Sequence, residues 1–411
     1  MRLLFITNFY PPASQGGFEE WCQEVTDGLR SLGHDIVVLT STHGREALQE
    51  PDPSWIQREL FLEMEFCSFR NAFLFFTSRQ KRERENLARL RQIIKSYRPD
   101  AILIWGMWNL HRSLPALAEN LMPGRVTYYM GDYWPTLPSQ VESYWNSPAR
   151  NVWVSLPKSL LKAIAKKILR REKKTHLCMD YVFFPSAFMS DEFERNGITP
   201  PSTRIVYGAI DTNLYLGYQK SWSHEDIISL LYVGRLTPEK GVHTAIKAMG
   251  YLVHEHGLEK LKLTIVGNGN PDYVDHLQEL VKQEVVGAFV TFLPAQPKKT
   301  LPSLYHHADI FLFTSIWAEP FGRVIVEAMA SGVAVIGSAV GGAGEILKNN
   351  ENALTFTPDD HVDLGRKMKR LIESSSLRER LAKAGREIAR NKFDICRMTT
   401  EIESCLQTLT H

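Results

Sequence analysis

The chain has 411 residues, which is too long for one ordinary hydrophobic core and fits two domains of about 200 residues each. Hydrophobic residues make up 44% and charged residues 23%, the balance of a globular protein, so a disordered chain is excluded. Lys and Arg number 48 against 46 Asp and Glu, and the net charge of +2 offers no overall attraction for nucleic acid.

The cysteines and the apolar runs indicate the cellular compartment in which the protein works. The cysteines are sparse, odd in number and without a C-x-x-C pair, which predicts a reducing compartment and no metal site. Residues 1–7 read as a first buried strand rather than as a signal peptide, and no run of about 18 apolar residues that could span a membrane occurs. We therefore expect a cytoplasmic protein. The cysteines are Cys22, Cys67, Cys178, Cys396 and Cys405.

Short apolar runs alternate with amphipathic stretches of helical length, a pattern typical of α/β units with parallel sheets. A helix is expected over residues 17–32, ended by Gly33. From about residue 228 the alternation is more regular. The expected strands cover residues 3–7, 36–40, 101–105, 126–130, 230–233, 263–266, 290–293, 310–314, 333–336 and 353–356.

This pattern predicts two doubly wound α/β domains, with a boundary near residues 205–225 and the polar stretch 219–226 as the linker. Such sheets bind ligands at the carboxyl ends of their strands. Two Rossmann-like domains that face each other across a cleft would place the active site in that cleft.

Segment 319–327, Glu-Pro-Phe-Gly-Arg-Val-Ile-Val-Glu, follows an expected strand and opens a helix near Gly322. The free amides and positive dipole of a helix N-terminus attract phosphate. Glu319 lies ahead of this helix and Glu327 inside it, where both could accept hydrogen bonds from sugar hydroxyls. For two acids alone, a helix-stabilising acid and a solvated Glu would be the simpler interpretation.

Segment 234–241 directly follows another expected strand and carries Arg235 and Lys240 between glycines. Two cations at the carboxyl end of a sheet suit a diphosphate, which gains negative charge as it leaves. The alternative is a solvated turn with surface charges.

Three further glycine-rich loops lie between expected strands and helices. Gly16 and Gly17 open the first helix, but not as G-x-G-x-x-G, so a nicotinamide cofactor loses support. Because the strands are parallel, all five loops reach the carboxyl edge of a sheet, and together they favour an anion site. The other two loops are 267–269 and 341–345.

These residues resemble the retaining glycosyltransferases of family four, also called glycosyl transferases group one, which have the GT-B fold. The resemblance rests on segments 16–19, 32–40, 319–327 and 341–345, and it covers nearly the whole chain. It implies an acceptor-side domain over residues 1–210, a donor domain over 211–392, and a last helix within 393–411 that crosses back to the first domain.

The resemblance further implies a retaining transfer from a nucleotide diphosphate sugar, by default a UDP-sugar, to a hydroxyl group. Arg235 and Lys240 would hold the diphosphate, Glu319 would contact the transferred sugar, and Glu327 would bind the ribose. No metal ion or cofactor is implied. The other expected donor-binding positions are Gly16, Gly17, Gly267, Phe321, Gly322 and Arg323.

The sequence departs from the family on the acceptor side. Many members have a His before the Asp that follows a strand of the first domain, whereas here Gly131 precedes Asp132. Asp132 is therefore the expected acceptor-side group, as a hydrogen-bond acceptor or weak base for the attacking hydroxyl. The alternative, an Asp that caps a turn before Pro135, is nearly as good an interpretation. Asn109 and His111 are further candidates.

Residues 158–174 hold eight Lys or Arg residues and one acid, with apolar residues at helical spacing. They predict a basic amphipathic helix that either lies on an anionic membrane or packs its apolar stripe on its own domain. The first option would suit a lipid-linked acceptor or glycan precursor. A nucleotide-sugar epimerase or hydrolase of the same fold, and a non-catalytic binding protein, are the alternative functions.

Overall fold

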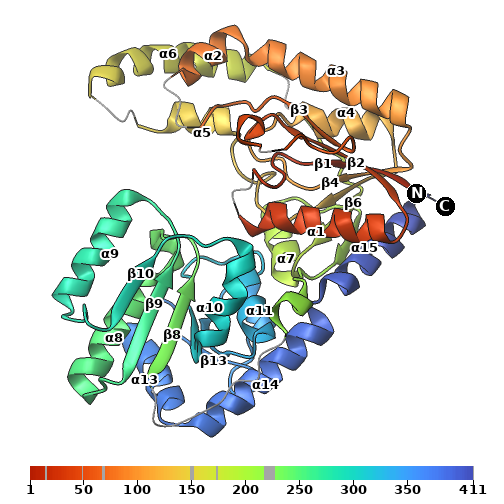
Figure 1. Cartoon of the computed structure of the whole chain (residues 1–411). Coiled ribbons are helices and arrows are strands. Elements are labelled where there is room, and N and C mark those ends of the chain that lie inside the picture. The colour runs from red at the N-terminus through yellow and green to blue at the C-terminus, as the bar shows by residue number, and fades with distance from the viewer. Residues whose placement is uncertain are drawn as a thin grey trace. The chain divides into compact units, whose positions relative to one another are not determined.

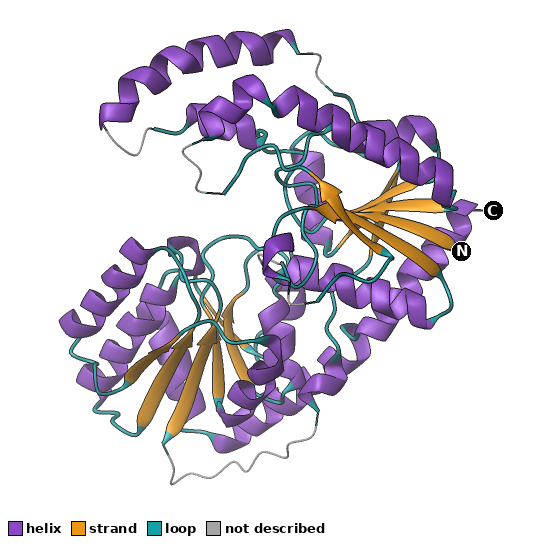
Figure 2. Cartoon of the chain, turned by 45° about the horizontal axis from the view of Figure 1, so that its top comes forward, coloured by secondary structure: helices purple, strands orange, loops and turns teal. Residues whose placement is uncertain are grey.

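The computed structural model describes residues 1–13, 16–48, 50–66, 70–148, 152–172, 175–216 and 227–410, so the linker expected at 219–226 lies outside the described residues. The chain folds into two compact units. Unit 1 comprises Met1–Phe184, Ser190–Val206 and Thr399–His411, and unit 2 comprises Pro185–Met189 and Tyr207–Met398. In each unit, helices cover both faces of one sheet (Figures 1 and 2).

Unit 1 is built on a seven-stranded parallel sheet in the order β3-β2-β1-β4-β5-β6-β7. The four strands expected in this half are confirmed. The edge strands β3 and β7 have polar sequences, so a search for apolar runs could not reveal them. The short apolar strand β6 was also not predicted from the sequence. The strands are β1 (Arg2–Ile6), β2 (Asp35–Ser41), β3 (Ile56–Leu60), β4 (Ala101–Ile104), β5 (Val126–Tyr129), β6 (Tyr181–Phe184) and β7 (Ser202–Ile205).

The helices of unit 1 include the expected first helix, which starts at Gly17 and ends at Ser31. Three others, α2, α5 and α6, form a small apolar cluster of their own around Trp145. The helices are α1 (Gly17–Ser31), α2 (Asn71–Thr77), α3 (Arg79–Tyr97), α4 (Ser113–Leu121), α5 (Gln140–Asn146), α6 (Val152–Arg171) and α7 (Ala187–Arg195), of which α7 begins in unit 2.

Unit 2 is built on a six-stranded parallel sheet in the order β10-β9-β8-β11-β12-β13. All six strands expected here are confirmed, because strands covered on both faces form nearly continuous apolar runs such as Ile-Phe-Leu-Phe in β11. The strands are β8 (Ile228–Val233), β9 (Leu261–Val266), β10 (Val290–Leu293), β11 (Ile310–Phe313), β12 (Ala334–Ser338) and β13 (Leu354–Phe356).

The helices of unit 2 end with a long one that is shared between the units: α15 begins in unit 2, and its residues from Thr399 belong to unit 1. The helices are α8 (Val242–His256), α9 (Pro271–Gln283), α10 (Leu301–His307), α11 (Arg323–Ala330), α12 (Ala343–Ile346), α13 (His361–Ile372), α14 (Ser375–Lys392) and α15 (Ile395–Thr410). Among the helices of the described ranges, none has the length and apolar composition that crossing a bilayer requires.

The strand orders locate the ligand-binding edge of each sheet. In both sheets the order reverses once, between β1 and β4 in unit 1 and between β8 and β11 in unit 2. Ligands of doubly wound sheets bind at the carboxyl ends of the strands at such a reversal. The loops that follow these four strands are therefore the places to look for a site.

Candidate functional site

An ion pair at the carboxyl edge of unit 2 joins two of the predicted residues. Lys240 closes a short turn after β8, and Glu319 lies in the loop after β11. Lys240 Nζ is 2.7 Å from Glu319 Oε1, and both side chains are largely buried, with 13% and 14% exposed. Lys240 Nζ also lies 5.3 Å from the ring centroid of Trp317. The reversal of strand order thus brings together a cation and a carboxylate that are far apart in the sequence.

Arg235 lies in the same loop as Lys240 and is exposed. Its backbone carbonyl accepts a hydrogen bond of 2.9 Å from the buried Tyr232 hydroxyl. Burial raises the pKa of Tyr232, and the neighbouring Glu319 carboxylate raises it further. Tyr232 therefore stays neutral, and its hydroxyl holds the backbone of the loop at Arg235. The Arg235 side chain remains exposed to solvent.

Gly267 is needed where the loops after β8 and β9 cross. Its φ is 157°, and a Cβ atom at this position would lie 1.8 Å from the carbonyl oxygen of Gly234. Its N–H donates to the carbonyl of Leu293 at 3.0 Å. The amide is therefore engaged in the fold, and this position contributes to a site by letting the two loops approach.

Glu327 lies inside α11 and is only 4% exposed, which rules out the interpretation as a solvated helix residue. The Tyr305 hydroxyl donates to its Oε2 at 3.0 Å, and Arg323 Nε donates to its Oε1 at 3.1 Å. Tyr305, from α10, was not predicted, because nothing in the sequence pattern links it to Glu327.

The start of α11 agrees with the expected turn. Its N-terminal cap is Gly322, with a φ of 116°, and no side chain of the described residues caps the helix. Phe321 is buried and packs on Phe393 with ring centroids 5.5 Å apart. Only the backbone of Phe321 is thus placed to face a ligand. Glu345, in the short helix α12 that follows β12, accepts hydrogen bonds from the amides of Ala187 and Phe188 instead.

In unit 1, Asp132 follows β5 at the carboxyl edge. Its Oδ1 accepts a hydrogen bond of 3.3 Å from the amide of Trp134, so it does cap the turn. Burial raises the pKa of Asp132 to about 7, and the neighbouring Glu19 also raises it. Glu19 was not predicted as a site residue. Its Oε2 accepts from the amide of Gly16 at 3.0 Å, so this glycine amide is engaged within the cap of α1.

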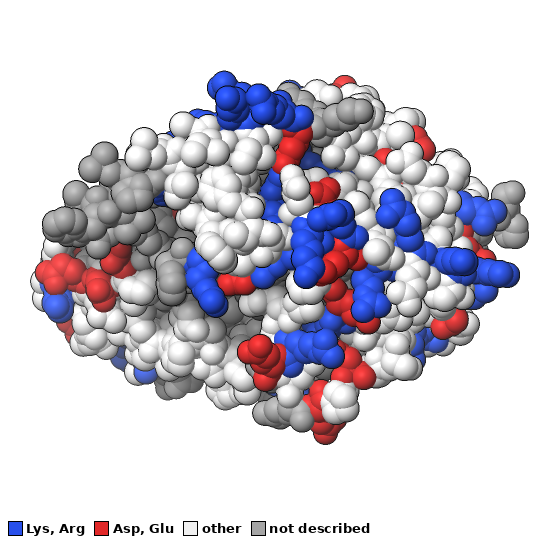
Figure 3. All heavy atoms as spheres, turned by 90° about the horizontal axis from the view of Figure 1, so that it is seen from above, with Lys and Arg blue, Asp and Glu red and all other residues white. Residues whose placement is uncertain are grey.

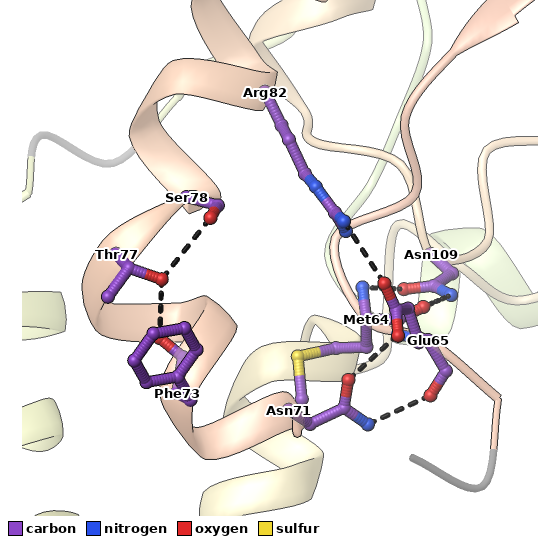
Figure 4. Close-up of polar contacts among 8 residues, drawn as sticks. All are labelled: Met64, Glu65, Asn71, Phe73, Thr77, Ser78, Arg82 and Asn109. Carbon is purple, nitrogen blue, oxygen red and sulfur yellow. Dashed lines mark hydrogen bonds and ion pairs between the residues drawn. The ribbon is translucent and has the colours of Figure 1, made fainter. Parts of the chain in front are cut away.

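The side chain of Asn109 is hydrogen-bonded within the fold (Figure 4). Its side chain accepts from the amide of Met64 at 3.0 Å and donates to the carbonyl of Met64 at 2.7 Å. His111 Nδ1 lies 3.0 Å from Glu83 Oε1 and 2.7 Å from Ser113 Oγ. Asn109 therefore holds a backbone segment, while His111 belongs to a charged group.

A carboxyl group that the sequence did not reveal belongs to the same charged region. Burial raises the pKa of Glu63 to about 7, although the nearby Arg79 and Arg112 guanidinium groups lower it. Burial also lowers the pKa of His111, partly offset by Glu83. The region therefore holds one carboxyl group, Glu63, with a pKa of about 7, beside the carboxyl ends of β3 and β4.

One cavity of unit 1, of about 360 Å³, is lined by Arg112, Pro135 and residues 175–179 and 197–200. None of the predicted site residues lines it. Within the described ranges, no group of three His, Cys, Asp or Glu side chains is arranged to hold a metal ion.

Two sequence families account for almost the whole chain. The model of the family described as Glycosyltransferase Family 4 matches residues 15–214, and that of Glycosyl transferases group 1 matches residues 219–388. The chain belongs to the group 1 glycosyltransferases. The match covers the predicted residues Arg235, Lys240, Glu319 and Glu327, and the resemblance drawn from them is confirmed.

Curated relatives of this glycosyltransferase match to different extents. The glycogen synthase of Mycobacterium tuberculosis (strain H37Rv) is 26% identical over 405 residues, which cover 96% of this chain and 91% of that protein. An uncharacterized glycosyltransferase of Methanocaldococcus jannaschii is 34% identical over 169 residues. That alignment covers 41% of this chain and 42% of the relative, so the chain matches less than half of the relative's length.

Solved structures with the same fold cover the chain from end to end. Sucrose-phosphate synthase from Thermosynechococcus elongatus has a TM-score of 0.73 at 18% identity and covers 99% of this chain and 98% of its own. Anabaena Alr3699/HepE in complex with UDP and glucose has a TM-score of 0.69 at 20% identity, with coverage of 99% and 100%. The two parallel sheets and these neighbours identify the fold of this glycosyltransferase as GT-B.

Proposed function

We propose that this glycosyltransferase transfers a sugar, with retention of anomeric configuration, from a nucleoside diphosphate sugar to an acceptor hydroxyl. The observation that carries the proposal is the Lys240–Glu319 ion pair at the reversal point of the unit 2 sheet. In this proposal Lys240 supplies a cation for the diphosphate, and the neighbouring Glu319 supplies a carboxylate that can accept from the sugar's hydroxyls. UDP is the first candidate for the nucleotide, because a structure of the same fold is a complex with UDP.

The donor groups have binding capacity left after their internal contacts. A Lys ammonium donates three hydrogen bonds, so Lys240 keeps two for phosphate oxygens while it pairs with Glu319. A carboxylate has about four lone-pair sites, so Glu327 can still accept from ribose hydroxyls beside Tyr305 and Arg323. The positive end of the α11 dipole, which no side chain of the described residues caps, adds positive potential.

No metal ion is required by this arrangement. Arg235, Lys240 and the α11 amides would stabilise the charge that develops on the leaving diphosphate. In metal-dependent glycosyltransferases a divalent ion has this role. Retention follows if the acceptor hydroxyl attacks on the face that the diphosphate leaves and gives its proton to the departing phosphate. Asp132 would orient the hydroxyl as a hydrogen-bond acceptor.

We also propose that residues 158–172, most of them in α6, contact an anionic membrane peripherally. Residues 173–174 of the range expected from the sequence lie outside the described residues. Leu161, Ile168 and Leu169 pack on the small cluster of α2 and α5, as the own-domain interpretation predicts. Leu160 and Ile164 instead remain 71% and 54% exposed.

The charge pattern limits how strong this membrane contact can be. On the face seen from the top of Figure 1, where α3 and α6 lie, Lys and Arg side chains are interleaved with Asp and Glu (Figure 3). Electrostatic attraction would therefore be modest, and insertion of Leu160 and Ile164 would have to supply much of the binding energy. Cys22, Cys178, Cys396 and Cys405 take part in no disulfide bond among the described residues, which fits a protein that works in the reducing cytoplasm.

The first test is a thermal-shift panel with UDP, GDP, ADP and the matched monophosphates, each with and without Mg²⁺. A ligand at 100 times its dissociation constant stabilises a fold by about 2.7 kcal/mol. We expect a shift with one diphosphate that does not depend on Mg²⁺. No shift with any diphosphate would contradict the donor site, and donor turnover without an acceptor would favour an epimerase or hydrolase.

A further inference from the structure

Four aromatic rings meet at the carboxyl edge of the unit 1 sheet. Phe9, His43, Phe66 and Trp108 follow β1, β2, β3 and β4 respectively. Ring centroids are 4.7 Å apart for His43 and Phe66, 5.6 Å for Phe66 and Trp108, and 5.7 Å for Phe9 and Phe66. Each of the four strand ends thus contributes one ring, and Phe66 contacts the other three. We call these four residues the aromatic platform.

The platform is not a closed core. Phe9 is buried at 2% exposure, His43 and Trp108 are half-buried, and Phe66 is 39% exposed. A cluster that merely sealed the end of the sheet would bury its outermost ring, because burying a Phe side chain gains about 1.5–3 kcal/mol. Phe66 instead contacts three other rings while it remains 39% exposed.

The backbone that leads to Phe66 is held in place. The Asn109 side chain both accepts from the backbone amide of Met64 and donates to its carbonyl (Figure 4). The Asn71 side chain does the same with the backbone of Glu65, and both of these hydrogen bonds are 2.8 Å long. Arg82 donates to the Glu65 carboxylate at 3.0 Å. The ring therefore stands on a pre-organised support, which lowers the entropy that a ligand must overcome.

Buried polar atoms without partners lie beside the platform. Asn8 is 4% exposed, and its Nδ2 donates to the carbonyl of Trp108 at 3.0 Å. Asn8 Oδ1 and the hydroxyl of Ser41, which is 1% exposed, have no hydrogen-bond partner among the described residues. The Ser41 amide donates to the Asn8 carbonyl at 3.4 Å, so the two are neighbours. Buried polar groups are normally satisfied, and these exceptions indicate that a ligand or water completes them.

We propose that the aromatic platform with Asn8 and Ser41 binds an uncharged pyranose ring of the acceptor, an inference that rests on the proposed transferase function. A pyranose combines an apolar C–H face, which stacks on an exposed ring such as Phe66, with hydroxyls that pair with buried polar groups. Burial lowers the pKa of His43, so the platform carries no charge at neutral pH. An anionic headgroup would find no cation among the platform residues.

The test uses the full chain with saturating UDP, so that the donor site is occupied. Saturation-transfer NMR would follow methyl glycosides of glucose, galactose, mannose and N-acetylglucosamine, with glycerol and glycerol 3-phosphate as non-pyranose probes. We expect at least one glycoside to bind. Its affinity should fall about tenfold in Phe66→Ala, the size of a lost aromatic contact. Ser41→Ala should weaken binding without touching a ring.

Phe73→Ala is the matched control, because Phe73 is an exposed aromatic residue, 67% accessible, on α2 outside the platform. Its glycoside affinity should equal that of the wild type. Binding of no glycoside, equal binding by Phe66→Ala and wild type, or a preference for glycerol 3-phosphate would each overturn the proposal. The UDP thermal shift, measured on the same samples, reports separately on the donor site, so failure of one does not imply failure of the other.

Discussion

Lys240 and Glu319 lie 2.7 Å apart, Nζ to Oε1, although they come from loops that follow different strands of unit 2. In the proposed donor site, this contact would hold both side chains where the diphosphate sugar binds. The pair is shielded from water, so the loss of either side chain leaves its partner without compensation.

Lys240→Ala should lower transfer by about 10²–10³-fold, the usual loss when one charge-stabilising donor is removed. The protein should still unfold cooperatively. The measurement is kcat/KM together with a melting curve. Lys282→Ala, which removes a largely exposed lysine from a surface pair with Glu279, is the matched control and should leave kcat/KM unchanged. Wild-type turnover by Lys240→Ala would refute the site.

Glu327→Ala should abolish transfer and also destabilise the fold, because the Tyr305 hydroxyl and the Arg323 guanidinium lose their shared partner. Removing one member of a buried ion pair costs about 3–5 kcal/mol. Glu327→Gln keeps an acceptor for Tyr305 and should recover part of that stability. Chemical denaturation and UDP affinity separate the two effects. If Glu327→Gln binds UDP like the wild type, the carboxylate has no role in donor binding.

Asp132 should produce an ascending limb in the pH profile of kcat/KM near pH 7. Burial raises its pKa to about 7, so the carboxyl group is neutral below this pH, and above it becomes the carboxylate, which is the stronger acceptor and the form that can act as a base. Asp132→Asn should remove the limb and lower activity. Glu63→Gln is the necessary comparison, because the pKa of Glu63 is also raised to about 7. A limb that vanishes only in Glu63→Gln would assign the titration to Glu63.

The same pKa shift makes Asp132→Asn informative for stability. A carboxyl group with a raised pKa in the folded state stabilises the fold when protonated, and this contribution is lost as the pH rises from about 4 through 7. The stability of Asp132→Asn relative to the wild type should therefore increase over that interval. Denaturant titrations at pH 5 and pH 8 would show it, and a constant difference would contradict the raised pKa.

Turnover should persist in excess EDTA, since cations and helix amides rather than a metal ion are proposed to neutralise the leaving diphosphate. The assay is initial rate with chelator and after adding back Mg²⁺ or Mn²⁺. Strict dependence on a divalent ion would remove the metal-free mechanism while leaving the fold assignment intact.

The double variant Leu160→Ser, Ile164→Ser should bind less well to vesicles that contain anionic phosphatidylglycerol, because both side chains are exposed and apolar. Co-sedimentation at low and high salt measures this. Leu214→Ser, which changes an exposed leucine of unit 2, is the matched control. Equal sedimentation of wild type and double variant would exclude α6 as the contact.

The local pattern of apolar and polar residues was sufficient to predict most of the strands. The strands of unit 2 are buried on both faces, so they form apolar runs that stand out from the helices between them. The edge strands β3 and β7 escaped prediction because they carry polar residues. Likewise, the loop position of Glu319 and the helical position of Glu327 follow from the turn and the helix that their own neighbours form.

The sequence by itself determined the fold class and the family and supplied the candidate donor-side residues, because these depend on short motifs and on the period of the hydrophobic residues. Only the tertiary structure decided which groups meet. The Tyr305–Glu327 hydrogen bond joins two helices, α10 and α11, whereas Asn109 and Met64 come from the loops after different strand ends, as do the rings of Phe9, His43, Phe66 and Trp108. Parallel strands separated by helices bring such ends to one edge, and burial there shifts pKa values that no local pattern encodes.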